Sequence, residues 1–124
     1  MEIRALVTDS NSQVRKNITR SLKELGIKNV AEAADAGQAI EMFEKGKYDI
    51  VFAEWNSKTA KGEELVSTLR RTDAKMPIIV TAPQSKQLAE IKKSCPTASN
   101  YLTTPFTTDQ LKKMVAQCVP SIAG

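Results

Sequence analysis

The stretch Tyr48–Gly62, with the sequence YDIVFAEWNSKTAKG, decides the fold of this chain. It contains four consecutive apolar residues, Ile50 to Ala53, and such an unbroken run is typical of a strand buried on both faces of a parallel sheet. The run ends at a carboxylate, Glu54, and a polar loop follows. Because α/β proteins place ligand chemistry at the carboxyl ends of parallel strands, we expect Glu54 to lie in a functional pocket.

Apolar strands that end in polar residues recur along the chain. The strands that we expect are residues 3–7, 29–34, 49–53, 78–80 and 100–103. The intervening helices are expected after Ser10, at 37–45, 63–71 and 84–93, and up to Cys118. Right-handed crossovers between parallel strands then predict an α/β fold, a doubly wound five-stranded parallel sheet in the order 2-1-3-4-5.

Helix-end signals support these assignments. Ser10 with Gln13, and Thr107 with Gln110, match capping boxes, in which a hydroxyl accepts from a backbone N–H three residues on. Gly26 is expected to end the first helix as a C-terminal cap.

Length and composition limit the classes of function. The 124 residues suffice for one domain, 1–124, with its own core. The absence of histidine excludes Ser-His-Asp and Cys-His catalysis and the commonest zinc ligand. Cys95 and Cys118 lack the spacing of a metal site or a disulfide framework. We expect a cytoplasmic protein without membrane partners, because no bilayer-length apolar run or signal-peptide pattern occurs. The net charge of +4 is too dispersed to predict nucleic-acid binding.

Over essentially its whole length the chain resembles the receiver domains of two-component response regulators, particularly the single-domain chemotaxis type. The matching residues follow the ends of strands one, three, four and five in the family's order. They are Leu6-Val7-Thr8-Asp9, Glu54-Trp55-Asn56, Gly62, Val80-Thr81-Ala82, Tyr101 and Thr104-Pro105-Phe106.

The resemblance implies a phosphorylation site. In the family, an acidic pair after strand one and an acceptor Asp after strand three bind Mg²⁺, together with the backbone carbonyl two residues past the acceptor. The Asp takes a phosphoryl group, whose oxygens are then bound by a Thr or Ser and by a Lys that precedes Pro. An aromatic residue on strand five swings inward and remodels the fourth helix and fifth strand.

Three residues depart from that pattern. Glu54 replaces the acceptor Asp, Thr8 the first acid, and Thr104 the Lys. The longer Glu moves its oxygens by roughly 1 Å, and phosphoryl transfer depends mostly on positioning. Losing a carboxylate weakens a Mg²⁺ site, and losing the Lys removes a stabilising cation. We therefore expect a degenerate site without catalytic residues, in which phosphorylation is weak or absent and Glu54, with about one negative charge, partly mimics a phosphoryl group.

The same comparison yields a set of expected ligands and partners. Any Mg²⁺ would be held weakly by Asp9, Glu54 and Asn56, and no cofactor is required. A lysine of the loop, Lys58 or Lys61, is expected to balance the acidic charge, unless both are solvated surface residues. We expect Thr81 Oγ1 to donate to Glu54, which would favour an inward Tyr101.

Signalling partners are expected on the face formed by the fourth helix, fifth strand and fifth helix. Tyr101 is either a mobile switch there or an edge aromatic packed on the fourth helix, and Lys86, Lys92 and Lys93 would attract acidic segments. We expect a monomer or weak dimer that is not an enzyme.

Two other functions remain open. Glu54 or Ser57 could still accept a phosphoryl group, and alkali would distinguish the labile acyl phosphate from a stable Ser ester. A flavodoxin-like cofactor binder is also conceivable because Thr8, Ser10, Asn11 and Ser12 form a hydroxyl-rich loop. That loop lacks the glycines that let backbone N–H groups bind phosphate.

Overall fold

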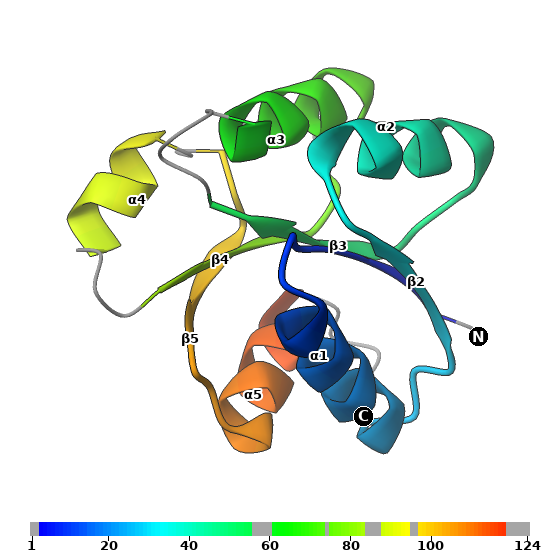
Figure 1. Ribbon diagram of the computed structural model, residues 1–124, viewed down its shortest axis with the longest axis vertical. Coiled ribbons are helices and arrows are strands. Elements are labelled where there is room, and N and C mark those ends of the chain that lie inside the picture. The colour runs from blue at the N-terminus through cyan, green and yellow to red at the C-terminus, as the bar shows by residue number, and fades with distance from the viewer. Residues whose placement is uncertain (1–2, 56–60, 74, 84–87, 95–96, 119–124) are drawn as a thin grey trace.

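A five-stranded parallel sheet in the order β2-β1-β3-β4-β5 confirms the predicted topology (Figure 1). The computed structural model describes residues 3–55, 61–73, 75–83, 88–94 and 97–118. The strands are β1 (Arg4–Thr8), β2 (Asn29–Ala33), β3 (Ile50–Glu54), β4 (Ile78–Pro83) and β5 (Asn100–Thr104). The helices are α1 (Ser12–Glu24), α2 (Ala36–Lys45), α3 (Lys61–Thr72), α4 (Leu88–Ser94) and α5 (Thr108–Cys118).

The helices cover both faces of the sheet. In Figure 1, α1 and α5 lie below the sheet, and α2, α3 and α4 lie above it. Ile50, Val51, Phe52 and Ala53 are each 0% exposed, as expected for the central strand. Alternate residues of β3 point to opposite faces, so Ile50 and Phe52 join the α1–α5 core while Val51 and Ala53 join the other. Among the described residues, no helix has the length and apolar character needed to cross a bilayer.

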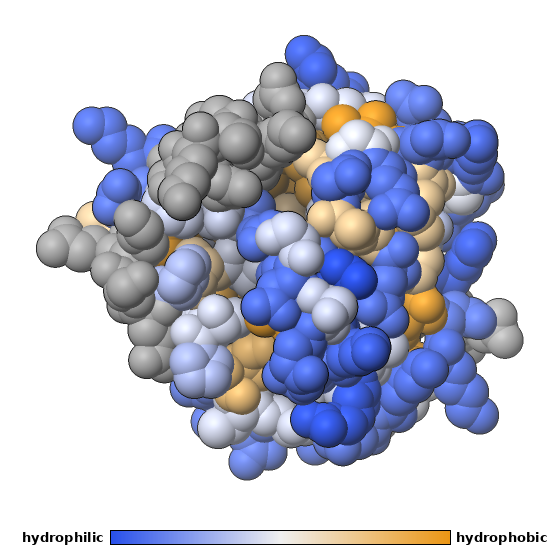
Figure 2. Space-filling view, in the orientation of Figure 1, coloured by the Kyte–Doolittle hydropathy of each residue, from blue (hydrophilic) through white to orange (hydrophobic). Residues whose placement is uncertain are grey.

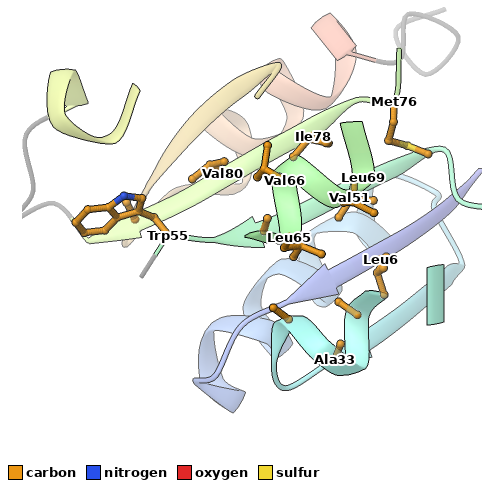
Figure 3. Close-up of a cluster of buried hydrophobic side chains, with 14 of the residues drawn as sticks. Leu6, Ala33, Val51, Trp55, Leu65, Val66, Leu69, Met76, Ile78 and Val80 are labelled. Carbon is orange, nitrogen blue, oxygen red and sulfur yellow. The ribbon is translucent and has the colours of Figure 1, made fainter. Parts of the chain in front are cut away.

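The core above the sheet extends to the end of β3. Leu65, Val66 and Leu69 of α3 pack on the sheet beside Val80, and Trp55 lies at the margin of this cluster (Figure 3). Full burial of an aliphatic side chain of this size contributes about 1.5–3 kcal/mol. The residue next to Glu54 is therefore anchored in the core, which restricts the position of the Glu54 backbone.

The N-terminal cap of α1 is Asn11, so the predicted capping role of Ser10 is wrong. Asn11 Oδ1 accepts from the backbone N–H groups of Gln13 and Val14, at 2.9 and 3.3 Å. An Asn is as good a cap as a Ser, and its position one residue later starts the helix at Ser12. The side chain of Ser10 is thereby released for another partner.

The other predicted helix ends are confirmed. Gly26 has a φ of +92°, a conformation that suits glycine, and it follows the last turn of α1. The Ile27 N–H donates to the Leu22 carbonyl at 3.0 Å, which completes a Schellman motif. At the start of α5, Thr107 and Gln110 exchange hydrogen bonds between side chain and backbone at 2.8 and 3.1 Å.

Arg70, near the end of α3, joins three segments of the chain. Its guanidinium donates to the carbonyls of Thr97 (2.8 Å) and Met76 and to the Ser99 hydroxyl (3.2 Å). Burial lowers its pKa. Arg70 thus fastens α3 to the entrances of β4 and β5.

Arg70→Gln should destabilise the fold by about 2–4 kcal/mol, because it removes charge-assisted hydrogen bonds and leaves carbonyls without a donor. Urea unfolding followed by Trp55 fluorescence measures the change. Arg71→Gln is the matched control, since exposed Arg71 donates to the Thr68 hydroxyl within its own helix. Its cost should stay below about 0.5 kcal/mol, and equal losses in the two variants would contradict the assigned role of Arg70.

Candidate functional site

The carboxyl ends of β1, β3, β4 and β5 meet along one edge of the sheet. Thr8 is paired with Ala53, Glu54 with Thr81, and Pro83 with Thr104. Because side chains alternate along a strand, Glu54 and Thr81 point toward the face that α1 and α5 cover, as Phe52 and Ile79 do. Predicted site residues from separate parts of the sequence are therefore neighbours.

Ser10 holds the carboxylate of Glu54. The Ser10 backbone N–H donates to Glu54 Oε1 at 3.0 Å, and the Ser10 hydroxyl donates to Oε2 at 3.1 Å. Each oxygen of Glu54 thus has a donor from the loop between β1 and α1. We call this pair of contacts the Ser10 clamp. Sequence reasoning missed it, although the place of Ser10 directly after a strand-end carboxylate was a usable signal.

Asp9 is a buried carboxyl group beside Glu54, with 4% of its surface exposed. Its pKa is raised from 3.8 to about 6, first by burial and then by the charge of Glu54 and a hydrogen bond to it. A bond from the Asn11 N–H, at 2.8 Å, and the charge of Arg15 act in the opposite direction. The two carboxyl groups are neighbours, so the negative charge of Glu54 disfavours ionisation of Asp9.

Arg15 connects the first turn of α1 to the site and is the second residue that sequence reasoning missed. Its guanidinium donates to the Asp9 carbonyl at 2.7 Å and pairs with Glu32 of β2 at 3.3 Å. The loop that carries Asp9 and Ser10 is therefore tied to the sheet edge. In the sequence, the position of Arg15 one turn into the helix that follows Asp9 was the available signal.

Two hydroxyl groups at this edge of the sheet are buried without a hydrogen bond to any described residue. They are Thr8 Oγ1 and Thr81 Oγ1, in side chains that are 4% and 1% exposed. The expected bond from Thr81 to Glu54 is therefore absent from the described part of the chain, because the Ser10 clamp draws the carboxylate toward β1.

The predicted switch and partner residues lie farther along the sheet. Tyr101 is half-buried against the core above the sheet, and Lys92 Nζ of α4 lies 5.8 Å from its ring centroid. This contact fits the packing alternative for Tyr101, and its switching remains a prediction. Thr104 is half-buried and its hydroxyl donates to the Ala82 carbonyl at 3.5 Å, while Lys93 is exposed.

Several predicted site residues lie outside the described residues, so their roles remain predictions. They are Asn56, Ser57, Lys58 and Lys86, together with the side chain of Lys61.

Comparison with known proteins identifies the family. The model of the response regulator receiver domain matches residues 5–116. The chain belongs to this receiver-domain family. The chemotaxis protein CheY of Pseudomonas aeruginosa is 26% identical over 124 residues, covering 98% of this receiver domain and 100% of that protein. CheY-3 of Vibrio cholerae is 27% identical over 113 residues, covering 90% and 87% of the two chains. The receiver domain is thus CheY-like and of the kind used in two-component signalling.

Solved structures confirm the CheY-like fold. CheY4 of Vibrio cholerae superposes with a TM-score of 0.84 at 20% identity, covering 96% of the receiver domain and 100% of that chain. TrrA of Thermotoga maritima, solved in complex with Mg²⁺ and BeF, gives a TM-score of 0.83 at 24% identity, with the same coverage. At these identities the likeness establishes the fold alone.

The acidic residues fit Mg²⁺ in the type of donor that they offer. Mg²⁺ prefers carboxylate oxygens and is usually bound by one or two of them with several waters. Asp9 and Glu54 supply two, and a cation between them would reduce their mutual repulsion. Within the described residues, however, no three His, Cys, Asp or Glu side chains cluster, and each Glu54 oxygen already accepts one hydrogen bond from Ser10.

Asp9→Asn should stabilise the protein at pH 8 by about 1–3 kcal/mol, and the gain should vanish near pH 4. The raised pKa means that folded Asp9 binds its proton more tightly than the unfolded chain does, so its contribution to stability falls as pH rises from about 4 to 6. Urea unfolding at both pH values measures the difference. Glu44→Gln, at an exposed position on α2, should change little. A gain that is the same at both pH values would contradict the assigned environment.

Proposed function

We propose that this receiver domain signals through protein–protein contacts in a phosphorelay while accepting phosphoryl groups weakly or not at all. It acts as a binding module rather than an enzyme and requires no cofactor. The Ser10 clamp carries this proposal, because it engages the one group that stands at the acceptor position.

The clamp opposes phosphoryl transfer through geometry. An attacking carboxylate oxygen needs a free lone pair aligned with the phosphorus atom of the donor. Both oxygens of Glu54 accept hydrogen bonds from Ser10, which lower their nucleophilicity and direct them toward β1. The Thr81 hydroxyl, which would contact a transferred group, makes no bond to Glu54.

The neutral side chain of Thr104, at the β4–β5 side of the site, also opposes phosphoryl transfer. Transfer develops negative charge on phosphoryl oxygens, and a nearby cation stabilises it. Thr104 offers a neutral hydroxyl that is bonded to the Ala82 carbonyl. Arg15 directs its guanidinium to the Asp9 carbonyl and to Glu32 instead.

Magnesium binding is possible at this site but weak. Asp9 and Glu54 would hold the ion, which would neutralise their charge and polarise a phosphoryl oxygen. Binding has to rearrange the hydrogen bonds of both acids, including the Ser10 clamp, and this lowers the affinity for Mg²⁺.

The α4–β5–α5 face is the proposed docking surface for signalling partners. Lys92 and Lys93 are exposed on α4, and Lys92 lies over the half-buried ring of Tyr101. Exposed cations around an aromatic ring favour acidic segments that also bring an apolar side chain.

Acetyl phosphate with Mg²⁺ tests the proposal directly. Intact-mass spectrometry should detect no phosphoryl adduct on the natural chain. The triple variant Thr8→Asp, Glu54→Asp, Thr104→Lys restores the family's residues and should gain the adduct. Stoichiometric modification of the natural chain would overturn the proposal, and its loss in mild alkali would assign it to Glu54 rather than to a Ser ester.

Ser10→Ala should tighten Mg²⁺ binding about 2- to 10-fold, because it removes one hydrogen bond that the ion has to displace. Trp55 fluorescence during Mg²⁺ titration reports the dissociation constant. Ser12→Ala is the control, since Ser12 is also exposed but begins α1. An unchanged constant in Ser10→Ala would show that the clamp does not restrain Glu54.

A further inference from the structure

A groove opens at the amino ends of the central strands, at the edge of the sheet opposite to Asp9 and Glu54. It has a volume of about 880 Å³, which lies within the range of ligand pockets. Its walls come from the last turns of α2 and α3, the first residue of β1 and the segments that lead into β3 and β4. These helix ends and strand starts lie toward the right of Figure 1. The proposed signalling function does not use this edge of the sheet.

Tyr48 forms an aromatic wall of the groove. Its ring stacks with that of Phe43, with the ring centroids 6.4 Å apart and an interplanar angle of 19°. Both residues are half-buried and pack against the core above the sheet, which holds the two rings in place while they line the groove. Gly46 leaves room for this arrangement, because a Cβ atom there would lie 3.4 Å from Tyr48 Cε2. The groove therefore presents a firmly packed aromatic surface to solvent.

Arg4 places a cation at this aromatic wall. Its guanidinium carbon lies 5.4 Å from the centroid of the Tyr48 ring, so a cation–π contact holds the group there. The Arg4 backbone is fixed as well, because its N–H donates to Asp49 Oδ2 and its carbonyl accepts from the Asp49 N–H, each at 2.8 Å. Within the described part of the chain, the guanidinium makes no hydrogen bond or ion pair. Its N–H donors are thus positioned and not engaged by any described residue. We call this cavity the Arg4–Tyr48 groove.

The Arg4–Tyr48 pair also borders a second hollow, on the side of β2. This hollow has a volume of about 180 Å³ and is lined by Asn29, Val30 and Ala31 together with the pair. Val30 and Ala31 are half-buried, and Figure 2 shows hydrophobic residues among hydrophilic ones on the surface beside β2 and α2. Apolar surface is therefore exposed on both sides of the cation.

The charges that line the Arg4–Tyr48 groove narrow the class of ligand. Three cations and three carboxylates among the described residues balance each other: Arg4, Lys45, Lys47, Glu44, Asp49 and Asp73. A polyphosphate would be repelled by the three carboxylates, whereas a ligand with one negative charge can contact a single cation. Arg4 is the cation at the aromatic wall, and a planar guanidinium matches a carboxylate through two parallel hydrogen bonds.

We propose that the Arg4–Tyr48 groove binds a small aromatic monocarboxylate. The carboxylate accepts two hydrogen bonds from the Arg4 guanidinium, and the ring of the ligand packs against Tyr48 and Phe43. The volume of the groove accommodates a ligand of more than one ring. The proposal does not depend on whether Glu54 accepts phosphate, because the two sites lie at opposite edges of the sheet.

NMR titration of the whole ¹⁵N-labelled chain with naphthalene-2-carboxylate tests the proposal. The amide signals of Arg4, Tyr48 and Asp49 should shift and saturate, while those of Ser10 and Glu54 should move little. Naphthalene-2-carboxamide has the same shape without the charge and should bind about fivefold more weakly or worse. Acetate has the charge without the ring and should cause no saturable shift over the same concentrations. Equal affinities of the carboxylate and the carboxamide, or shifts centred on Ser10, would overturn the proposal.

A phosphate ester separates a carboxylate site from a general anion site. Naphthalen-2-yl phosphate carries more negative charge on the same ring system, so the three carboxylates of the groove should disfavour it. It should bind more weakly than naphthalene-2-carboxylate. Tighter binding of the phosphate would overturn the proposal, in favour of a phosphate site.

Substitution of Arg4 tests its assigned contact. Arg4→Gln should weaken naphthalene-2-carboxylate binding about tenfold and change carboxamide binding less than about twofold, because only the charged probe uses the guanidinium. Arg71→Gln is the matched control, since exposed Arg71 lies near the end of α3 but does not line the groove. Its effect on either probe should stay below about twofold. An equal loss of carboxylate binding in the control would contradict a specific site.

Arg4→Lys keeps the test decisive if Arg4→Gln does not fold. A lysine preserves the positive charge beside Tyr48 but lacks the planar pair of donors. Naphthalene-2-carboxylate should therefore bind about threefold more weakly or worse, with carboxamide binding unchanged. Unchanged carboxylate affinity in Arg4→Lys or in a folded Arg4→Gln would overturn the proposal and leave Arg4 a purely structural role.

Discussion

Two carboxyl groups, Asp9 and Glu54, meet at one edge of the sheet, and the contacts around them limit the repulsion between them. Asn11 donates to Asp9 and Ser10 donates twice to Glu54, while burial and the neighbouring acid raise the pKa of Asp9 to about 6. Arg15 ties the loop that carries these donors to β2. The site is thus stabilised by hydrogen bonds to both carboxyl groups.

The sheet makes this arrangement rigid. β1 and β3 are buried on both faces, and Trp55 is packed into the core directly after Glu54. A close-packed interior transmits small displacements and gives little room for relaxation. The extra methylene of Glu54 is therefore accommodated at its carboxylate end, where the exposed Ser10 loop provides donors.

Because Glu54 is restrained in this way, the surface of the receiver domain becomes important for recognising partners. The chain has a net charge of +4, and its exposed cations include Lys92 and Lys93 on α4. Surface charge mainly sets which partners are attracted and how fast they associate.

Periodicity and punctuation in the sequence were enough to predict the strand order, the buried run at Ile50 and the helix end at Gly26, because these depend on local conformation and on general rules of chain connection. The same patterns predicted that Asp9, Glu54 and Thr81 lie at one edge of the sheet. The Ser10 clamp, the raised pKa of Asp9 and the bonds of Arg70 came only from the tertiary structure. Ser10 and Glu54 are 44 residues apart, and the choice of Asn11 as the helix cap released the Ser10 hydroxyl. The hydrogen-bond partner of a polar side chain depends on distances and competing donors in the folded chain. The spacing of residues in the sequence does not give these.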